Sequence, residues 1–145
     1  MPTSLKLDGT YLKMAQTWAS LSKAKRKKVG CLIVKDGVII SDGYNGTPSG
    51  FDNDCEILLD EHDPNALLTK PEVLHAESNA ITKLAKSTQS SDGATMYITI
   101  NPCIECSKLI IQSGIKRVVF RNFYKNDEGI RLLKRANIEV YSYED

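Results

Sequence analysis

The sequence contains no apolar run that approaches the roughly 20 residues needed to span a bilayer. Its N-terminal segment also lacks the charged, apolar and small-residue order of a signal peptide. We therefore expect a cytoplasmic protein with no membrane partner. No charge of one sign dominates, because 19 lysines and arginines face 18 aspartates and glutamates, for a formal net charge of +1. A dedicated nucleic-acid-binding domain usually carries a strong basic excess, so no nucleic-acid partner is expected.

Cysteine is scarce, with four in 145 residues. Structural disulfides are rare in the cytosol. The four residues Cys31, Cys55, Cys103 and Cys106 are therefore expected to be core thiols or metal ligands before they are cross-links.

Repeats, low-complexity tracts and interdomain linkers are absent from the sequence, so we expect one domain over residues 1–145. Hydrophobic periodicity and turn signals predict its elements. The expected helices are 9–22 (with Asp8 as N-cap), 74–87, 103–113 (ended by Gly114) and 127–136. The expected strands are 29–34, 38–45, 94–100, 116–121 and 138–143.

The order of these elements predicts the fold class. The first two strands flank Lys35–Gly37, a tight-turn signal, and are expected to form an antiparallel hairpin. The later strand–helix–strand units predict right-handed crossovers and parallel pairing, with helices on both faces. We therefore predict an α/β protein, a three-layer α/β/α sandwich around a five-stranded mixed sheet. The long insert between Asn45 and His75 is expected to be irregular or briefly helical, and its length indicates a function.

A Cys-x-x-Cys pair follows Pro102, at the start of a predicted helix. Residues three apart at a helix start share one face, so Cys103 and Cys106 can both reach one ion. A redox dithiol or two structural thiols have the same spacing. His75, at the head of another helix, supplies a third ligand of the kind that Zn²⁺ prefers. Three protein ligands leave the fourth position to water, which is typical of a catalytic zinc site.

Glu77 lies two residues after His75, where a carboxylate beside the metal can move protons. The combination H-x-E … P-C-x-x-C is the signature of zinc-dependent nucleobase deaminases. The predicted reaction is hydrolytic deamination of an amidine carbon. Glu77 would take a proton from water, protonate the ring nitrogen and later protonate the departing amine. Taken singly, His75 also fits a helix cap, and the helix dipole alone favours Glu77 in a first turn.

The remaining candidates for metal binding are weaker. Cys31 lies in an apolar strand and is expected in the core. Cys55 and His62 lie in the insert, and a second metal there stays open. A zinc-stabilised binding module without enzymatic activity also stays open. Such a module predicts a fourth protein ligand, and the sequence offers three convincing ones.

Four stretches carry a family resemblance: GYNGTPSG (Gly43–Gly50), HAESNAI (His75–Ile81), the run Gly93–Phe120 and YKND (Tyr124–Asp127). Over roughly residues 8 to 143 the chain resembles the deoxycytidylate (dCMP) deaminase family, which has the cytidine deaminase-like fold. The resemblance implies Zn²⁺-dependent conversion of dCMP to dUMP, which feeds thymidylate synthesis. It also implies a homo-oligomer, with a hexamer expected, that dCTP activates and dTTP inhibits, with Mg²⁺ accompanying the triphosphate effector.

The resemblance also implies roles for particular residues. It places Asn45 at the sugar, Tyr124 near the phosphate, and Ala76 of the HAE motif at the substrate. It assigns the GYNGxP loop to the regulatory site, with Gly43, Tyr44, Gly46 and Asp52 as effector-binding candidates. Without it, Asn45 fits the left-handed position of an Asn-Gly turn equally well, and Tyr124 fits a surface tyrosine. Some viral members carry a second, structural zinc, but the matching positions Ala24 and Lys25 cannot ligate one.

A phosphate dianion needs cationic or N–H partners. The basic run Ser22–Lys28 precedes the first strand, at the edge where such a pocket is expected. Arg26 and Lys28 are our candidates, whereas Lys23, Lys25 and Lys27 are expected to be solvated.

Other substrates remain possible for the same zinc motif. Deamination of dCTP or of free cytidine and deoxycytidine is the nearest alternative. An enzyme acting on a polynucleotide base would need a basic, aromatic-rich groove. The aromatic content of 7% and the near-neutral charge argue against that alternative.

Overall fold

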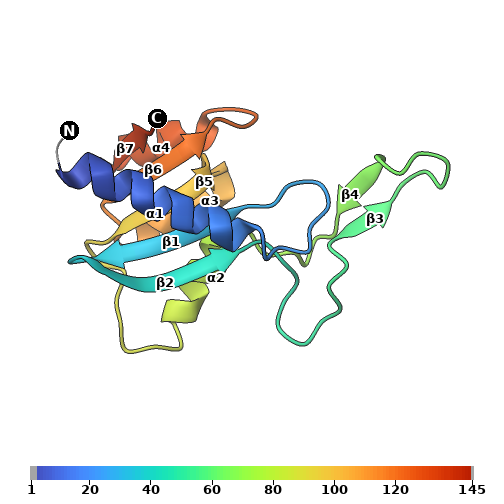
Figure 1. Ribbon diagram of the computed structural model, residues 1–145, viewed down its shortest axis with the longest axis horizontal. Coiled ribbons are helices and arrows are strands. Elements are labelled where there is room, and N and C mark those ends of the chain that lie inside the picture. Colours follow the sequence, from blue (N-terminus) through green and yellow to red (C-terminus); the bar gives the residue numbers. More distant parts are fainter. Residues whose placement is uncertain (1–2, 145) are drawn as a thin grey trace.

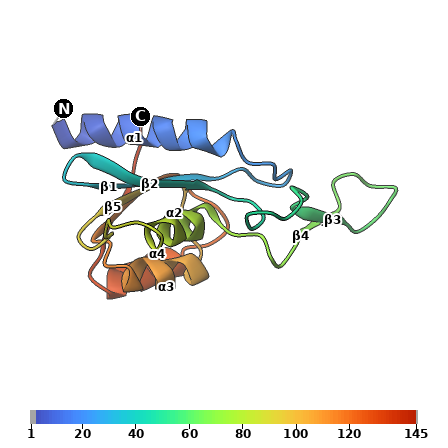
Figure 2. The ribbon, with the colours of Figure 1, turned by 90° about the horizontal axis from the view of Figure 1, so that it is seen from below.

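The computed structural model describes residues 3–144, and it has three layers (Figures 1 and 2). Helix α1 covers one face of a five-stranded sheet, and three helices lie on the other side. The helices are α1 (Thr3–Ala19), α2 (Ala76–Leu84), α3 (Ile104–Gln112) and α4 (Glu128–Arg135). The strands of the large sheet are β1 (Gly30–Lys35), β2 (Val38–Tyr44), β5 (Thr95–Ile100), β6 (Arg117–Asn122) and β7 (Glu139–Ser142). The predicted three-layer α/β/α class is confirmed.

The large sheet has the strand order β2-β1-β5-β6-β7. Strand β1 pairs antiparallel with both β2 and β5, and β6 pairs parallel with β5 and β7. The turn between β1 and β2 has positive φ angles at Asp36 (52°) and Gly37 (77°), as a two-residue hairpin turn requires. The hairpin and the parallel crossovers are therefore confirmed. The carboxyl end of β5 leads directly into Pro102 and the cysteine pair.

Two hydrophobic clusters hold the layers together. The larger one joins the sheet to α2, α3 and α4, and it includes Cys31, which is 0% exposed, as predicted for a core thiol. The smaller one packs α1 on the opposite face through Leu12, Ala15 and their neighbours. Within the part of the chain that the structure describes, no helix combines the length and hydropathy needed to cross a bilayer.

The prediction that Asp8 caps the first helix is wrong. Helix α1 already includes Thr3, and Asp8 lies inside it with 1% exposure. Its carboxylate accepts hydrogen bonds from both terminal nitrogens of Arg117 (2.9 and 2.7 Å) and from the hydroxyl of Tyr97 (2.7 Å). Burial raises the pKa of Asp8, but the hydrogen bonds from Arg117 and Tyr97 outweigh it and leave the pKa below its usual value. Asp8 is thus the polar link between α1 and the sheet.

The insert before α2, all of which the structure describes, is mostly irregular, as expected, but it contains a short two-stranded ribbon and no helix. Strand β3 (Glu56–Leu58) pairs antiparallel with β4 (Leu67–Thr69). In Figure 1 this β3–β4 arm extends away from the body of the protein. An isolated ribbon of this size is marginal by itself, so its contacts with the body are important. The carboxylate of Glu56 accepts hydrogen bonds from the backbone N–H groups of Lys25 (2.9 Å) and Arg26 (3.1 Å).

Candidate active site

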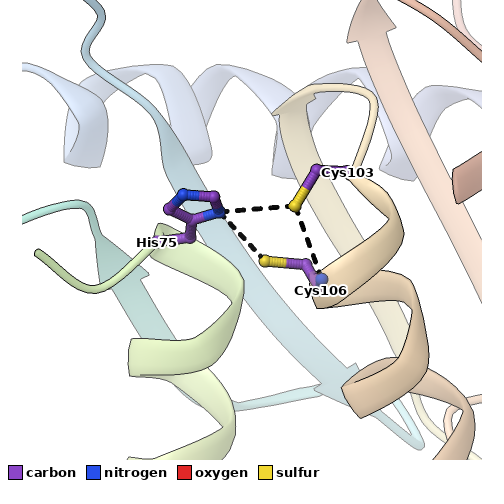
Figure 3. A group of neighbouring side chains, drawn as sticks. All are labelled: His75, Cys103 and Cys106. Carbon is purple, nitrogen blue, oxygen red and sulfur yellow. Dashed lines mark hydrogen bonds between the residues drawn. The ribbon is translucent and has the colours of Figure 1, made fainter. Parts of the chain in front are cut away.

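Three metal-ligating side chains come together at two helix starts (Figure 3). His75 is the N-cap of α2 and Cys103 is the N-cap of α3, and both have extended backbones, with ψ of 159° and 170°. Cys106 lies in the first turn of α3, and its backbone N–H donates to the sulfur of Cys103. This is the i, i+3 arrangement predicted from the sequence. The two helices bring together residues that are about thirty positions apart in the chain.

The geometry of this group fits zinc. Nδ1 of His75 lies 3.2 Å from Sγ of Cys106 and 3.5 Å from Sγ of Cys103. A tetrahedral zinc with bonds of ~2.0 Å to nitrogen and ~2.3 Å to sulfur separates those atoms by ~3.5 Å. The donor set of one imidazole and two thiols is also the kind that zinc selects. The three predicted ligands His75, Cys103 and Cys106 therefore form a zinc-binding site.

The surroundings favour the metal-binding form of Cys103. Hydrogen bonding from Cys106, and then from His75, lowers the pKa of the Cys103 thiol to about 3. The start of α3 adds a positive field from its backbone N–H groups. These contacts favour the thiolate form of Cys103, the species that binds zinc, while hydrogen bonding to Cys103 raises the pKa of the Cys106 thiol.

Glu77 lies in the first turn of α2 and is 4% exposed. Burial raises the pKa of its carboxyl group, because the charged form loses hydration. It lines the same cavity as His75 and Cys103. Glu77 therefore lies beside the metal ligands, and its role as proton carrier stays a prediction.

The cavity next to these residues has a volume of about 290 Å³. It is lined by Ala24, Arg26, Lys27, Val29, Asn45, Cys55, Glu56, Thr69, Val73, His75, Ala76, Glu77, Ile100, Asn101, Cys103, Tyr124, Lys125 and Asn126. Such a volume suits a small-molecule ligand. The lining contains one buried acid beside the metal ligands and three cationic side chains. The cavity can therefore hold a molecule that combines a polar ring with an anionic group.

Several substrate-binding candidates from the sequence do line this cavity. Ala76, Tyr124 and Arg26 are among its residues. Asn45 is another, and its amide accepts from the N–H of Val29 (2.9 Å) and donates to the carbonyl of Lys27 (2.7 Å). Asn45 thus fixes the end of the basic run as well as facing the cavity. Its contact with a sugar stays a prediction.

The structure selects a different lysine from the one that the sequence favoured. Among the described residues, Lys27 lines the cavity and Lys28 does not. The ammonium group of Lys27 lies 4.8 Å from the centroid of the Tyr124 ring. The reason is that Ser22–Lys28 forms an irregular loop, without the periodicity that would show which side chains face inward.

The polar cavity residues to which the sequence interpretation gave no role include Lys27, Glu56, Asn101 and Lys125. The ammonium group of Lys125 lies 5.3 Å from the centroid of the Tyr124 ring. In the sequence, the one sign that Lys125 lines the cavity is its position next to Tyr124 in the YKND stretch. Asn101 precedes the Pro-Cys pair, and Glu56 lies in the arm, where no local pattern indicated a role.

The effector-binding candidates lie along β2 and the loop that follows it. Gly43 packs tightly on α2, since a Cβ there would lie 2.5 Å from the carbonyl of Ala76. Gly46 pairs with Leu74 through two backbone hydrogen bonds. The Tyr44 carbonyl accepts from the side chain of Asn79, and Asp52 lies 3.6 Å from the ammonium of Lys70. These contacts give the loop structural roles, and effector binding stays a prediction.

A second metal site does not assemble in the residues that the structure describes. The one group of three metal-ligating side chains found there is His75, Cys103 and Cys106. Cys55 is buried, and its sulfur donates to the carbonyl of Asn53. His62 is exposed beside Glu61 at the far end of the arm.

Comparison with known proteins agrees with this chemistry. Residues 5–122 match the family described as the cytidine and deoxycytidylate deaminase zinc-binding region. The deoxycytidylate deaminase of Enterobacteria phage T4 is 35% identical over 172 residues, covering 92% of this chain and 88% of that protein. The deoxycytidylate deaminase of Homo sapiens is 38% identical over 123 residues, covering 82% of this chain and 67% of that protein.

A solved structure extends the likeness to three dimensions. It is the dCMP deaminase from the cyanophage S-TIM5 in complex with dCMP and dUMP, which has a TM-score of 0.87 and 42% sequence identity. The match covers 99% of each chain. Because the family match spans most of the sequence and the zinc-site geometry agrees with it, this chain belongs to the cytidine and deoxycytidylate deaminase zinc-binding family.

Proposed function

We propose that this protein catalyses the hydrolytic deamination of dCMP to dUMP. The observation that carries the proposal is the zinc-binding group of His75, Cys103 and Cys106 beside the buried carboxyl of Glu77, in a cavity that also holds cations. The dCMP deaminases from phage T4 and the cyanophage S-TIM5 are similar over nearly the whole chain. Water and dCMP are consumed, and dUMP and ammonia are produced.

Each site residue has a distinct part in this reaction. His75, Cys103 and Cys106 would hold a zinc ion, which would supply a Lewis acid that lowers the pKa of water. Glu77 accepts a proton from the attacking water and gives it to the ring nitrogen next to the amino-bearing carbon. Glu77 then takes the proton of the hydroxyl newly added to that carbon and gives it to the amino group, which leaves as ammonia while the carbonyl of dUMP forms. Burial of Glu77 keeps this carboxyl away from bulk solvent, so the proton stays within the site.

The cationic side chains favour a phosphorylated substrate. Arg26, Lys27 and Lys125 line the cavity, and the ammonium groups of both lysines lie near the ring of Tyr124. A 5′-phosphate is a dianion, and charge-assisted hydrogen bonds to it are stronger than neutral ones. We therefore propose that the phosphate-binding group consists of Lys27, Lys125 and Tyr124, with Arg26 as a further contributor.

The family resemblance carries the regulatory part of the proposal. We infer a homo-oligomer, with a hexamer expected, that dCTP with Mg²⁺ activates and dTTP inhibits. The loop with Gly43, Tyr44, Gly46 and Asp52 is the proposed effector site. Sigmoidal dependence of rate on dCMP that becomes hyperbolic with dCTP would support this control, and a hyperbola under all conditions would contradict it.

A substrate panel tests the catalytic proposal. The purified zinc-loaded protein is incubated with dCMP, CMP, deoxycytidine, dCTP and a cytosine-containing oligodeoxynucleotide, and ammonia release is measured. We expect the highest kcat/KM for dCMP. A higher kcat/KM for dCTP, deoxycytidine or the oligonucleotide would replace dCMP by that substrate, and no release from any of them would contradict the deaminase proposal.

The phosphate-binding group has its own matched test. Lys27→Ala is expected to raise KM for dCMP about tenfold, because one charge-assisted contact is lost, and to change KM for deoxycytidine little. Lys28→Ala is the control, since it removes the same charge from the next position. If the two variants raise KM for dCMP equally, Lys27 acts only through the overall positive charge of the loop.

A further inference from the structure

The residue before the Pro-Cys pair makes an unusual set of contacts. Asn101 is 5% exposed and directly follows β5. Its side-chain oxygen accepts from the backbone N–H of Tyr124. Its side-chain nitrogen donates to the carbonyls of Tyr124 (3.3 Å) and Asn126 (2.9 Å). All three side-chain hydrogen bonds therefore go to the short segment Tyr124–Asn126.

These hydrogen bonds flank a residue with a strained backbone. Lys125 has a φ of 62°, a left-handed conformation that long side chains seldom adopt and that persists only where the surroundings hold it. Asn101 binds backbone groups of the two residues that flank Lys125, namely Tyr124 and Asn126. The conformation in which the ammonium of Lys125 lies near the ring of Tyr124 is therefore held by one buried amide.

The same segment is joined to the zinc ligands at a second point. Helix α4 begins just after it, and Gly129 in its first turn packs against the loop of the cysteine pair. A Cβ at Gly129 would lie 2.2 Å from the carbonyl of Pro102 and 2.8 Å from that of Cys103. The zinc ligand Cys103 and the cation Lys125 thus belong to two loops in direct contact. The distance from the metal to the cationic side chains depends on that contact.

We propose that Asn101 is a positioning residue for substrate specificity. By holding the Tyr124–Asn126 segment against the zinc loop, it sets the place of Lys125 and Tyr124 relative to the metal ligands. It thereby determines how well a 5′-phosphate is bound while the base lies at Glu77. This inference rests on the proposed deamination of dCMP, and it assigns Asn101 no contact with the reacting atoms.

The test compares Asn101→Ala with a matched control. Asn101→Ala is expected to raise KM for dCMP at least about tenfold, because three hydrogen bonds that order the segment are lost, while kcat falls less than about threefold. KM for deoxycytidine, which has no phosphate, changes little. Asn122→Ala is the control. Asn122 is the last residue of β6, and its side-chain amide donates to the carbonyl of Thr99 in β5 at 3.3 Å, so this variant also removes a hydrogen bond at the ends of these strands.

Two further measurements separate positioning from general structural damage. In a Lys125→Ala background, adding Asn101→Ala is expected to raise KM for dCMP by a clearly smaller factor than in the unmodified protein, since the cation that it positions is gone and only Tyr124 remains to be displaced. Hydrogen exchange at the Tyr124 amide is expected to be slow in the unmodified protein and at least about tenfold faster in Asn101→Ala. If Asn101→Ala does not fold, the isosteric Asn101→Asp carries the same test, because it loses both donated hydrogen bonds.

Several outcomes would overturn the inference. One is an equal increase in KM for dCMP and for deoxycytidine in Asn101→Ala. Another is that Asn101→Ala and Lys125→Ala change KM for dCMP independently in the double variant. A third is loss of zinc from folded Asn101→Ala. Failure of the dCMP proposal is distinguishable, because it appears as missing dCMP turnover in the unmodified protein and removes this inference with it.

Discussion

The zinc ligands and Glu77 lie at the starts of two helices that pack on the sheet, whereas the cations of the same cavity lie on two loops. His75 and Cys103 are the N-caps of α2 and α3, so the backbone at the metal is held by many helix and core contacts. The loop with Arg26 and Lys27 is fixed largely by Glu56 and Asn45, and the segment with Lys125 is fixed by Asn101.

This difference separates two kinds of effect. We expect changes at the helix starts to act on the chemical step, because they remove a metal ligand or the proposed proton carrier. We expect changes at the loops to act on substrate binding, because a lost hydrogen bond would let a cation move while the metal ligands stay in place. The expected signatures are a fall in kcat for the first region and a rise in KM for the second.

Removing a ligand is expected to have the largest effect. Cys103→Ser should abolish stoichiometric zinc binding and deamination together, because serine does not replace a thiolate as a zinc ligand. Metal analysis of the purified protein and ammonia release measure the two losses. Cys31→Ala is the matched control, since Cys31 is a buried core thiol outside the group of metal ligands. Retention of one zinc per chain in Cys103→Ser would remove Cys103 from the metal site.

Glu77→Gln is expected to lower kcat by about 10²–10⁴-fold, because the amide cannot carry the proton. Zinc content should stay unchanged, which distinguishes this variant from the cysteine variant. Glu105→Gln is the control: Glu105 also lies in a first helical turn but is exposed and bound to Lys108 at 2.8 Å. Full activity in Glu77→Gln would mean that another group moves the proton.

A change at the contact between α1 and the opposite face of the sheet should lower the stability of the protein and leave its catalytic activity unchanged. Asp8→Asn is expected to lower the free energy of unfolding by about 3–5 kcal/mol, because the guanidinium of Arg117 loses its buried partner. Denaturant titration measures this loss, and kcat of the remaining folded protein should not change. Asp127→Asn is the control, since its pair with Arg131 is largely exposed and such pairs contribute about 0–1 kcal/mol.

The same carboxylate predicts a pH dependence of stability. The pKa of Asp8 in the folded protein lies below its usual value, so the folded state binds the proton less readily than the unfolded state does. The contribution of Asp8 to the free energy of unfolding is therefore fully present above its pKa in the unfolded chain, about 3.9. This contribution is lost as the pH falls through its pKa in the folded protein. In Asp8→Asn this part of the acid dependence should be missing, and an unchanged acid profile would contradict the assignment.

The smallest effect is expected at the arm. Glu56→Ala should raise KM for dCMP by about three- to tenfold, because the backbone of Lys25 and Arg26 loses its two hydrogen bonds to the carboxylate. Steady-state kinetics with dCMP and deoxycytidine measure it, and kcat should stay nearly constant. Glu61→Ala, in the exposed connection between β3 and β4, is the control. A fall in kcat with unchanged KM would show that the arm acts on chemistry rather than on binding.

Much of the site was predictable from the sequence because its signals are local. The i, i+3 spacing of Cys103 and Cys106 at a helix start specifies that their side chains share a face, and the H-x-E spacing of His75 and Glu77 at another helix start matches the deaminase signature. The alternation of strands and helices likewise predicts the parallel crossovers that bring those two helix starts to one edge of the sheet. Backbone periodicity alone carries this information.

Only the tertiary structure decided the rest. Whether Lys27 or Lys28 faces the cavity depends on the hydrogen bond that Asn45 donates to the Lys27 carbonyl and on the one that Glu56 accepts from the Arg26 N–H, and both partners lie far along the chain. The pairing of Asp8 with Arg117 spans 109 positions, so local capping rules gave the wrong role for Asp8. Asn101 shows the same limit, because a loop has no period of its own. The Asn101 side chain points toward the Tyr124–Asn126 segment because it satisfies backbone groups there, more than twenty positions along the chain.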